Sequence, residues 1–390
     1  MEIGSLWNSN WRGFMNNRQS FLNTMLLLFL ITIPLSFACT GDNTDSDDPD
    51  SMDSFMLDTL IVVDSIGVFM GDSTEMFAYI TSATPLPDRR FAVLDILTGR
   101  ISVFTMTGVF QNSFGGMGSG PGEFQGAIHM GLMTNGHLLI QDRMGDEFVV
   151  FSQEGEYLYS IPIDPLFSPI DWAIFPCDDS TFVKYSYTRE VLNQTIVQEW
   201  EIIRCSIENG ETQTTYFSNQ QNIDEEPLDW LSCYKVVTTG NNGEVYISDC
   251  VSDNYEIQVL TTEGDTIRTL RKAATTIPVS DDDVGYIIPL VHLWPDTAHP
   301  RNIPGMFPEF RPFVGQMDVD SIGNLWARRG TVNEHIWDVF SPEGEWLGGV
   351  FLEGLPINET VELHMNRFGA VATVYEPEDY YRVYIFNDEE

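Results

Sequence analysis

Basic residues are scarce in this sequence. The 390 residues include 19 lysines and arginines against 58 aspartates and glutamates, which gives a formal net charge of −39, and only Lys184, Lys235 and Lys272 are lysines. A surface this negative repels phosphate backbones and anionic lipid, so nucleic acid is excluded as a partner. The charge fits either a protein that binds cations or cationic partners, or adaptation to a salty habitat, where ions screen self-repulsion.

Several catalytic signatures are also absent. The sequence contains no GK[ST], GxSxG, HExxH or CxxC, which excludes a Walker loop, a nucleophile elbow, a zincin site, and a zinc ribbon or thioredoxin-type site. No long helical pattern follows residue 40. With 43% hydrophobic and 12% aromatic residues, the chain can still bury a large core.

Residues 1–38 are predicted to be a signal peptide. Arg12 and Arg18 precede the apolar run FLNTMLLLFLITIPLSFA, which ends directly before Cys39. The run is also about as long as a membrane span, so an uncleaved anchor is the alternative. The ending LSFAC resembles a bacterial lipoprotein signal, although Ser36 stands where leucine is usual. The resemblance implies lipidation of Cys39 and a membrane-tethered protein of the cell envelope, periplasmic or facing the outer membrane.

Residues 39–56 are predicted to be a disordered acidic linker behind that cysteine. The stretch GDNTDSDDPDSMD carries six aspartates and no aromatic residue, so it cannot bury enough surface to fold. Such runs resemble surface-export signals of some Gram-negative lipoproteins, and a plain spacer is the alternative.

Export would place the other four cysteines in an oxidising compartment, where disulfides can form. Cys233 and Cys250 face each other across a hairpin if its turn centres on Asn241 and Asn242, which makes them candidates for a cross-strand disulfide. Cys177 and Cys205 share the preceding unit and form the weaker candidate pair.

A unit recurs along residues 57–390. Each copy has alternating apolar runs and a glycine-containing turn, with copies beginning at Arg90, His137, Glu244 and Asn324 and turn glycines at Gly108, Gly155, Gly264 and Gly344. Two weaker copies run from about Asp171, around Gly210, and from Val361 to the end. Six four-stranded antiparallel units predict an all-β fold, a six-bladed β-propeller.

Two departures from the repeat are informative. The last unit lacks an outer strand, which LDTLIVVDSIGVFM, from Leu57, could supply to close the ring. A proline-rich insertion, about residues 271–307, separates the fourth and fifth units. Its length and apolar residues fit either contact with a ligand or partner, or a loop packed across one face.

The stretch GGMGSGPGEF, Gly115–Phe124, looks like a phosphate loop but joins two strand units. It resembles the connection between blades of NHL-type repeats, which implies that Phe124 packs between blades. The resemblance covers about residues 57–390 and extends to TolB-like six-bladed lipoproteins. It implies a fold more than an activity, because propellers serve both as scaffolds and as enzymes.

Weak metal candidates follow from similar propellers. Gluconolactonase-like propellers bind a divalent ion with axial Glu, Asn and Asp, and NHL-like amidating lyases bind zinc with histidines of different blades. These resemblances make Glu123, His129, Asp142 and Asp249 candidates for binding Ca²⁺ or Zn²⁺. However, Asp95, Asp142 and Asp249 each end a second strand, a position that fits a turn cap in every blade.

The fifth unit breaks this pattern with Arg328. Together with Arg143 and Arg329, it predicts an anion-binding spot on one propeller face. The function that we expect is binding or scaffolding in the cell envelope, through a propeller face that contacts a protein, peptide or glycan. The alternative is a metal-dependent hydrolase or lyase with its site in the central channel, and the sequence does not decide between a binding protein and an enzyme.

Overall fold

The fold is described from a computed structural model, which describes residues 56–162, 173–192, 195–222, 235–249, 254–279, 309–330, 335–356, 361–376 and 380–386. The chain divides into two compact units, Met1–Ser51 and Met52–Glu390. All described residues lie in the second unit, so the predicted signal peptide, Cys39 and most of the acidic linker lie outside them. The described part contains twenty-four strands, and within it no helix is long and apolar enough to cross a membrane.

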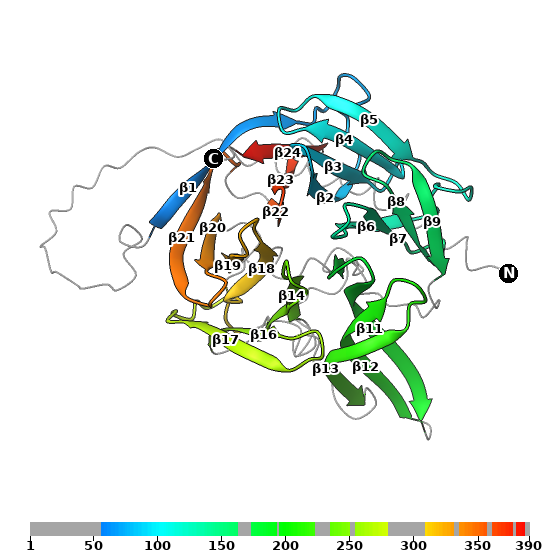
Figure 1. Cartoon of the computed structure of the whole chain (residues 1–390). Coiled ribbons are helices and arrows are strands. Elements are labelled where there is room, and N and C mark those ends of the chain that lie inside the picture. The colour runs from blue at the N-terminus through cyan, green and yellow to red at the C-terminus, as the bar shows by residue number, and fades with distance from the viewer. Residues whose placement is uncertain are drawn as a thin grey trace, which may run out of the picture. The chain divides into compact units, whose positions relative to one another are not determined.

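The strands form six antiparallel blades arranged around a common axis (Figure 1). The first two blades contain β2 (Ile80–Leu86), β3 (Arg90–Asp95), β4 (Arg100–Thr105) and β5 (Phe110–Gly115), then β6 (Ala127–Leu132), β7 (Leu138–Asp142), β8 (Glu147–Phe151) and β9 (Tyr157–Pro162). In both, the first strand is innermost and the chain moves outward strand by strand. The predicted strand units are therefore confirmed as blades of a six-bladed β-propeller.

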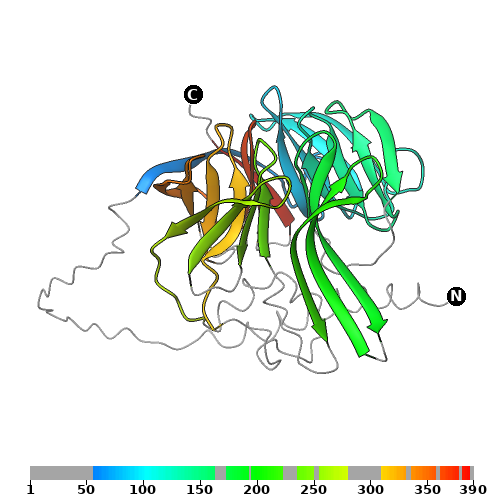
Figure 2. The same cartoon turned by 60° about the horizontal axis from the view of Figure 1, so that its bottom comes forward.

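The third blade is longer than the repeat predicts. It contains β10 (Ile174–Pro176), β11 (Thr181–Leu192), β12 (Thr195–Ser206) and β13 (Thr212–Asn222). Because β10 pairs only with residues 182–184 of β11, the rest of that strand continues past the beginning of the innermost strand. Figure 2 shows these three long green strands projecting beyond the other blades.

The fourth blade is followed by the predicted insertion. It contains β14 (Lys235–Thr239), β15 (Val245–Asp249), β16 (Tyr255–Leu260) and β17 (Thr266–Lys272). After β17, Pro278 forms a β-bridge to Phe310, and the N–H of Arg311 donates to the carbonyl of Ile277 at 2.8 Å. The insertion thus leaves and returns through a short paired neck, and its residues 280–308 lie outside the described part.

One strand joins the last two blades. These contain β18 (Val314–Val319), β19 (Leu325–Arg329), β20 (Ile336–Phe340) and β21 (Trp346–Glu353), then β22 (Val361–Asn366), β23 (Gly369–Glu376) and β24 (Tyr380–Phe386). The first half of β1 (Met56–Ile66) runs parallel to β21, and its second half pairs antiparallel with β24 (Figure 1). The predicted closure is confirmed, and β1 also adds a fifth strand to the fifth blade.

Hydrophobic side chains fill the spaces between blades. In the described part, six buried clusters each contain residues of two neighbouring blades, including the pair formed by the sixth and first. This arrangement follows from the sequence, because successive side chains of a strand point to opposite faces of the sheet. A blade inside a ring buries both faces, so both sets of side chains are apolar.

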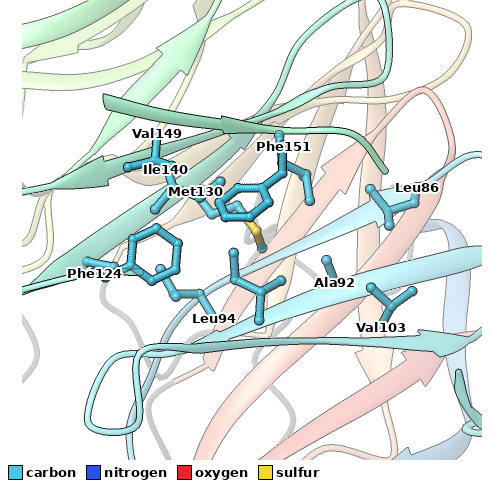
Figure 3. Packing of buried hydrophobic residues seen from close by; sticks show 12 residues of the cluster. Leu86, Ala92, Leu94, Val103, Phe124, Met130, Ile140, Val149 and Phe151 are labelled. Carbon is cyan, nitrogen blue, oxygen red and sulfur yellow. The ribbon is translucent and has the colours of Figure 1, made fainter. Parts of the chain in front are cut away.

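The stretch Gly115–Phe124 is confirmed as a connection between the first two blades. Phe124 is 0% exposed and packs with Leu94 of the first blade and Ile140 of the second (Figure 3). Gly115 has φ of +82°, and a Cβ there would lie 2.6 Å from the Phe124 ring. A side chain at position 115 would therefore be strained and would collide with the buried ring.

Candidate functional site

At one end of the propeller, the first strand of each blade begins and the second strand ends. We call this end the connection face. On this face Ile80 pairs with Asp95, and Ala127 pairs with Asp142. It carries the connections between blades and the turns between second and third strands. The extension of the third blade projects on this side, because β11 continues past the beginning of β10.

The repeating aspartates cap backbone turns on this face. Asp142 is 1% exposed, and its carboxylate accepts hydrogen bonds from the N–H groups of Gln125 at 2.8 Å and Gly126 at 2.7 Å. Asp95 does the same for Ala78 and Tyr79 at 3.0 and 3.2 Å. These aspartates fix the chain just before it enters an innermost strand, as the capping alternative predicted.

The other predicted metal ligands have separate roles. Glu123 accepts a hydrogen bond from the N–H of Gly120 at 2.9 Å, and Asp249 forms an ion pair with Lys235. His129 accepts a hydrogen bond from the N–H of Ile174 at 3.4 Å. The described residues contain no group of three or more His, Cys, Asp or Glu side chains placed to hold a metal ion. The set Glu123, His129, Asp142 and Asp249 is therefore not brought together.

The arginines of the predicted anion-binding spot contact different parts of the molecule. Arg329 binds both oxygens of Asp338, at 3.0 and 2.7 Å. Arg328 donates instead to the carbonyls of Val361 at 2.8 Å and Gly315 at 3.1 Å, on the side of the sixth blade. Arg143 belongs to the second blade, across the ring. By register, Arg329 rather than Arg328 replaces the repeating aspartate, because it pairs with the first residue of β18.

The disulfide candidates have different outcomes. Cys177 packs against the fourth blade, whereas Cys205 packs against the second, so the two side chains lie on opposite faces of their sheet and are not joined. Burial raises the pKa of the Cys177 thiol to about 11, which leaves it unreactive. Cys233 and Cys250 lie outside the described residues. Their hairpin pairs Lys235 with Asp249, one residue away from the predicted register.

A polar group lies at the propeller axis, and we call it the axial cluster: Gln316 and Asp318 of β18, Glu362 and His364 of β22, and His129 of β6. Sequence reasoning identified His129 as a candidate ligand but missed Gln316, Asp318 and Glu362. Gln316 holds the two strands together, because its amide accepts from the N–H of Leu363 at 3.3 Å and donates to the same residue's carbonyl. Its amide nitrogen also donates to Asp318 at 2.9 Å. The signal in the sequence is alternation, since Glu362 and His364 flank buried Leu363 in VELHMN.

Enclosure by the surrounding blades changes the titration of this cluster. Burial raises the pKa of Asp318 well above its usual value, and hydrogen bonding to Gln316 opposes the rise. Burial also raises the pKa of Glu362, against the opposing charge of Arg328. The pKa of His129 falls to about 4 through burial, and that of His364 falls to about 3 through burial and the nearby His129. Both imidazoles are therefore neutral near pH 7.

Three tyrosines of the sixth and first blades form a group of neighbouring rings. The ring of Tyr381 lies 5.1 Å from that of Tyr79 and 4.9 Å from that of Tyr375, measured between centroids. Burial raises the pKa of Tyr381, and the neighbouring Tyr79 and Glu362 raise it further. The Tyr381 hydroxyl is therefore neutral and able to donate a hydrogen bond.

Exposed apolar side chains continue from these tyrosines across the connection face. We call them the methionine patch: Phe69, Met70, Met76, Tyr79, Leu97, Met117 and Met144. Arg100 donates to the carbonyls of Ser73 and Met76, which places that segment beside the first blade. Met117 lies against Gly99, and Met144 lies against Gly126. The patch therefore runs over connections of the sixth, first and second blades.

Comparison with known proteins agrees with this fold. Residues 81–249 match the sequence model of a family described as "6-bladed beta-propeller". The chain is a six-bladed β-propeller. The match spans the first three blades and the two inner strands of the fourth. No curated protein matches the sequence.

Solved structures of similar architecture are distant in sequence. A member of the DUF4221 family from Bacteroides vulgatus is 10% identical, with 84% of this chain and 97% of that chain covered and a TM-score of 0.47. A virginiamycin B lyase from Staphylococcus aureus is 11% identical, with 81% and 82% covered and a TM-score of 0.38. A gluconolactonase from Xanthomonas campestris is 10% identical, with 80% and 88% covered and a TM-score of 0.41.

Proposed function

We propose that the chain is a binding module of the bacterial cell envelope that presents its connection face to a protein partner. The observation that carries this proposal is the methionine patch. Met70 is 79% exposed and Met144 is 70% exposed, on connections of the same face. Exposed apolar groups gathered on one face are typical of protein-binding surfaces, and methionine adapts its shape to a partner.

The charge around the patch defines the partner further. Asp72, Glu123 and Asp146 are exposed on the same connections, within a chain whose net charge is −39. A partner segment with apolar side chains between lysines or arginines complements this surface. A peptide segment fits the same description, whereas a neutral glycan would use the tyrosines and leave the acidic rim unmatched.

Variants on the two opposite faces of the propeller test the proposal. The double variant Met70→Asp, Met144→Asp alters the patch, and Ile322→Asp alters an apolar residue that is 74% exposed on a turn of the opposite face. Proteins captured from detergent-solubilised envelope are identified, and their direct affinity for the purified chain is measured. We expect the double variant to lose at least tenfold in affinity and Ile322→Asp to bind normally. Equal binding by all three forms, or binding only to glycans, would overturn the proposal.

The envelope location rests on Cys39 as the lipidated residue. Metabolic labelling with a radioactive fatty acid, followed by cell fractionation, tests the anchor. We expect label on the full chain in the membrane fraction and none on Cys39→Ser. Label on the variant, or a wild type without label, would contradict lipidation at this residue. Protease digestion of intact cells then distinguishes a surface-exposed protein from a periplasmic one.

A metal-dependent hydrolase or lyase with Ca²⁺ or Zn²⁺ at the axis is the second function that we propose to test. One observation favours it: His129 and His364 are both uncharged at neutral pH, the form in which imidazole binds metals. Elemental analysis of the purified chain, before and after chelation, measures the metal content. One ion per chain that disappears in His129→Gln, His364→Gln would support this function, and no ion in either form would contradict it.

A further inference from the structure

We infer that a groove between the second and third blades binds an extended peptide segment that carries a lysine or arginine side chain. The groove has a volume of about 500 Å³ and is lined by residues of β9 and of two turns of the third blade, at the end opposite the connection face. We call it the interblade groove. None of its lining residues belongs to the methionine patch, so this second site goes beyond the proposed function and does not depend on it.

The walls of the interblade groove are fixed to one another by backbone hydrogen bonds. Asp179 and Ser180 line it from the turn between β10 and β11, and Ile207 and Glu208 line it from the turn after β12. The N–H of Ile207 donates to the carbonyl of Ser180 at 2.7 Å, which joins the two turns. The Oδ1 atom of Asp179 accepts from the N–H of Asn135 in the second blade at 2.5 Å. The groove is therefore formed before a ligand arrives.

Strand β9 borders the groove with its edge. Four consecutive residues, Tyr159–Pro162, line the groove. Because successive side chains of a strand point to opposite faces, a groove that touches all four lies along the edge of the strand. Strand β9 is outermost in its sheet (Figure 1), so alternate residues direct their N–H and C=O groups away from β8. An extended peptide can pair with these groups and add a strand to the blade.

The charge of the groove selects a basic side chain. Asp179 and Glu208 are exposed, and no lysine, arginine or histidine is among the described residues that line the groove. Within the described part of the chain, neither carboxylate forms an ion pair. Tyr159 is 43% exposed, and the faces of aromatic rings attract ammonium and guanidinium groups. A lysine or arginine of the peptide complements this surface.

Other occupants fit the groove less well than a basic peptide. A small polyamine would satisfy the two carboxylates but would leave the backbone groups of β9 without a partner. A second copy of this chain would bring 58 acidic residues against 19 basic ones, and its surface would be repelled by the groove. An extended basic peptide uses both the edge of the strand and the charge.

Peptide selection followed by direct binding tests the inference. A random heptapeptide library displayed on phage is selected on the double variant Met70→Asp, Met144→Asp, so that the methionine patch does not compete. The enriched peptide is synthesised with a fluorescent label, and anisotropy gives its dissociation constant for the wild type. The neutral probe carries Nε-acetyl-lysine in place of lysine, or citrulline in place of arginine. We expect basic peptides to be enriched, and the neutral probe to bind on the order of tenfold more weakly.

Variants of the two carboxylates place the peptide in the groove. Asp179→Asn keeps the Oδ1 oxygen that holds Asn135, and Glu208→Gln changes an exposed side chain. The double variant should weaken binding by on the order of tenfold. Glu211→Gln is the matched control, because Glu211 is exposed on the same turn as Glu208 and is not among the lining residues; it should bind as the wild type does. Thermal unfolding verifies that each form is folded.

Backbone methylation of the peptide tests pairing with β9. Two versions of the enriched peptide carry N-methyl groups on alternate amides, at odd positions in one and at even positions in the other. A strand that pairs along one edge uses only every second N–H group. We therefore expect one version to lose binding and the other to keep it. Spermidine, which has no amide groups, should not displace the labelled peptide at equal concentration.

Several results would overturn the inference. They are a selection that enriches no basic peptide, a neutral probe that binds as tightly as the charged one, and equal effects of Glu211→Gln and the double variant. Equal binding of the two methylated peptides, or displacement by spermidine, would remove the role of the β9 edge and overturn the inference as well. None of these results bears on the methionine patch, whose proposed function fails only if its own variant keeps the protein partner.

Discussion

The ammonium group of Lys272 lies 3.1 Å from the Oδ1 atom of Asp338 and so joins the outermost strand of the fourth blade to the third strand of the fifth. Asp338 is 0% exposed and also accepts from Arg329 at 2.7 Å and from the indole of Trp346 at 3.0 Å. Lys272 lies over the Trp346 ring at 4.9 Å. This buried network fixes the blade from which the insertion departs.

The first prediction concerns this network. Asp338→Asn should lower the free energy of unfolding by about 3 kcal/mol, because it removes a fully buried carboxylate from two partly buried cations, Lys272 and Arg329. Urea unfolding followed by tryptophan fluorescence measures the change. Glu256→Gln is the matched control, since its partner Arg271 is 66% exposed and an exposed pair contributes less than about 1 kcal/mol. Equal effects of the two variants would show that burial does not strengthen the Asp338 network.

The second prediction concerns the plug between the first two blades. Phe124→Ala should cost about 3–5 kcal/mol, because it opens a cavity in a close-packed cluster. Phe124→Leu should cost less, since it refills part of the space. Phe69→Ala is the control because that ring is 56% exposed. Denaturant unfolding of the three variants gives the order, and a Phe124→Ala that is as stable as Phe69→Ala would refute the packing role.

The third prediction separates capping from metal binding. Asp142→Ala removes the acceptor of hydrogen bonds from Gln125, Gly126 and Gly145, and it should lower the free energy of unfolding by about 1–3 kcal/mol. Adding Ca²⁺ or Zn²⁺ should not change the difference between variant and wild type. Thermal unfolding with each ion and with chelator measures both effects. A metal-dependent stabilisation that Asp142→Ala abolishes would restore this residue as a ligand.

The fourth prediction concerns pH. In the folded chain, the pKa is about 4 for His129 and about 3 for His364, whereas a histidine in the unfolded chain has a pKa of 6.5. As pH falls below 6.5, the unfolded chain takes up these protons first, so the folded state loses stability, on the order of 3 kcal/mol per histidine by pH 4. Above 6.5 the histidines contribute no pH dependence.

Stability between pH 4 and 8 is compared for the wild type and His129→Gln, His364→Gln. The double variant should show a shallower loss below pH 6.5. Burial raises the pKa values of Asp318 and Glu362, so these carboxyl groups stabilise the folded state as pH falls and oppose the effect of the histidines. Comparing the two proteins isolates the contribution of the histidines. Parallel profiles for the two proteins would show that these histidines are not the groups that titrate.

The repeat could be read from the sequence because its signals are local. Alternating apolar residues and turn glycines recur within each blade, and Gly108, Gly155 and Gly264 all have positive φ as tight turns require. Phe124 was also found locally, from the connection around it. The closing role of β1 followed from counting strands, because the last unit was one short.

The sites depend on tertiary structure that one sequence does not specify. Arg328 was misplaced by one residue, because the sequence alone does not show that Arg329 pairs with the first residue of β18, as Asp95 pairs with the first residue of β2. The axial cluster combines residues of the second, fifth and sixth blades. No spacing within a blade predicts that Asp318 and Glu362 both lie at the axis.

The pairing of β1 also fixes the order in which the fold can be completed. Its partners are β21 and β24, which the ribosome synthesises roughly three hundred residues later. The inner blades can form hairpins as they emerge, because their contacts are local. The first strand has to wait for the end of the chain, so closure is a late, long-range event, and a nascent chain that stops before Tyr380 keeps an open seam.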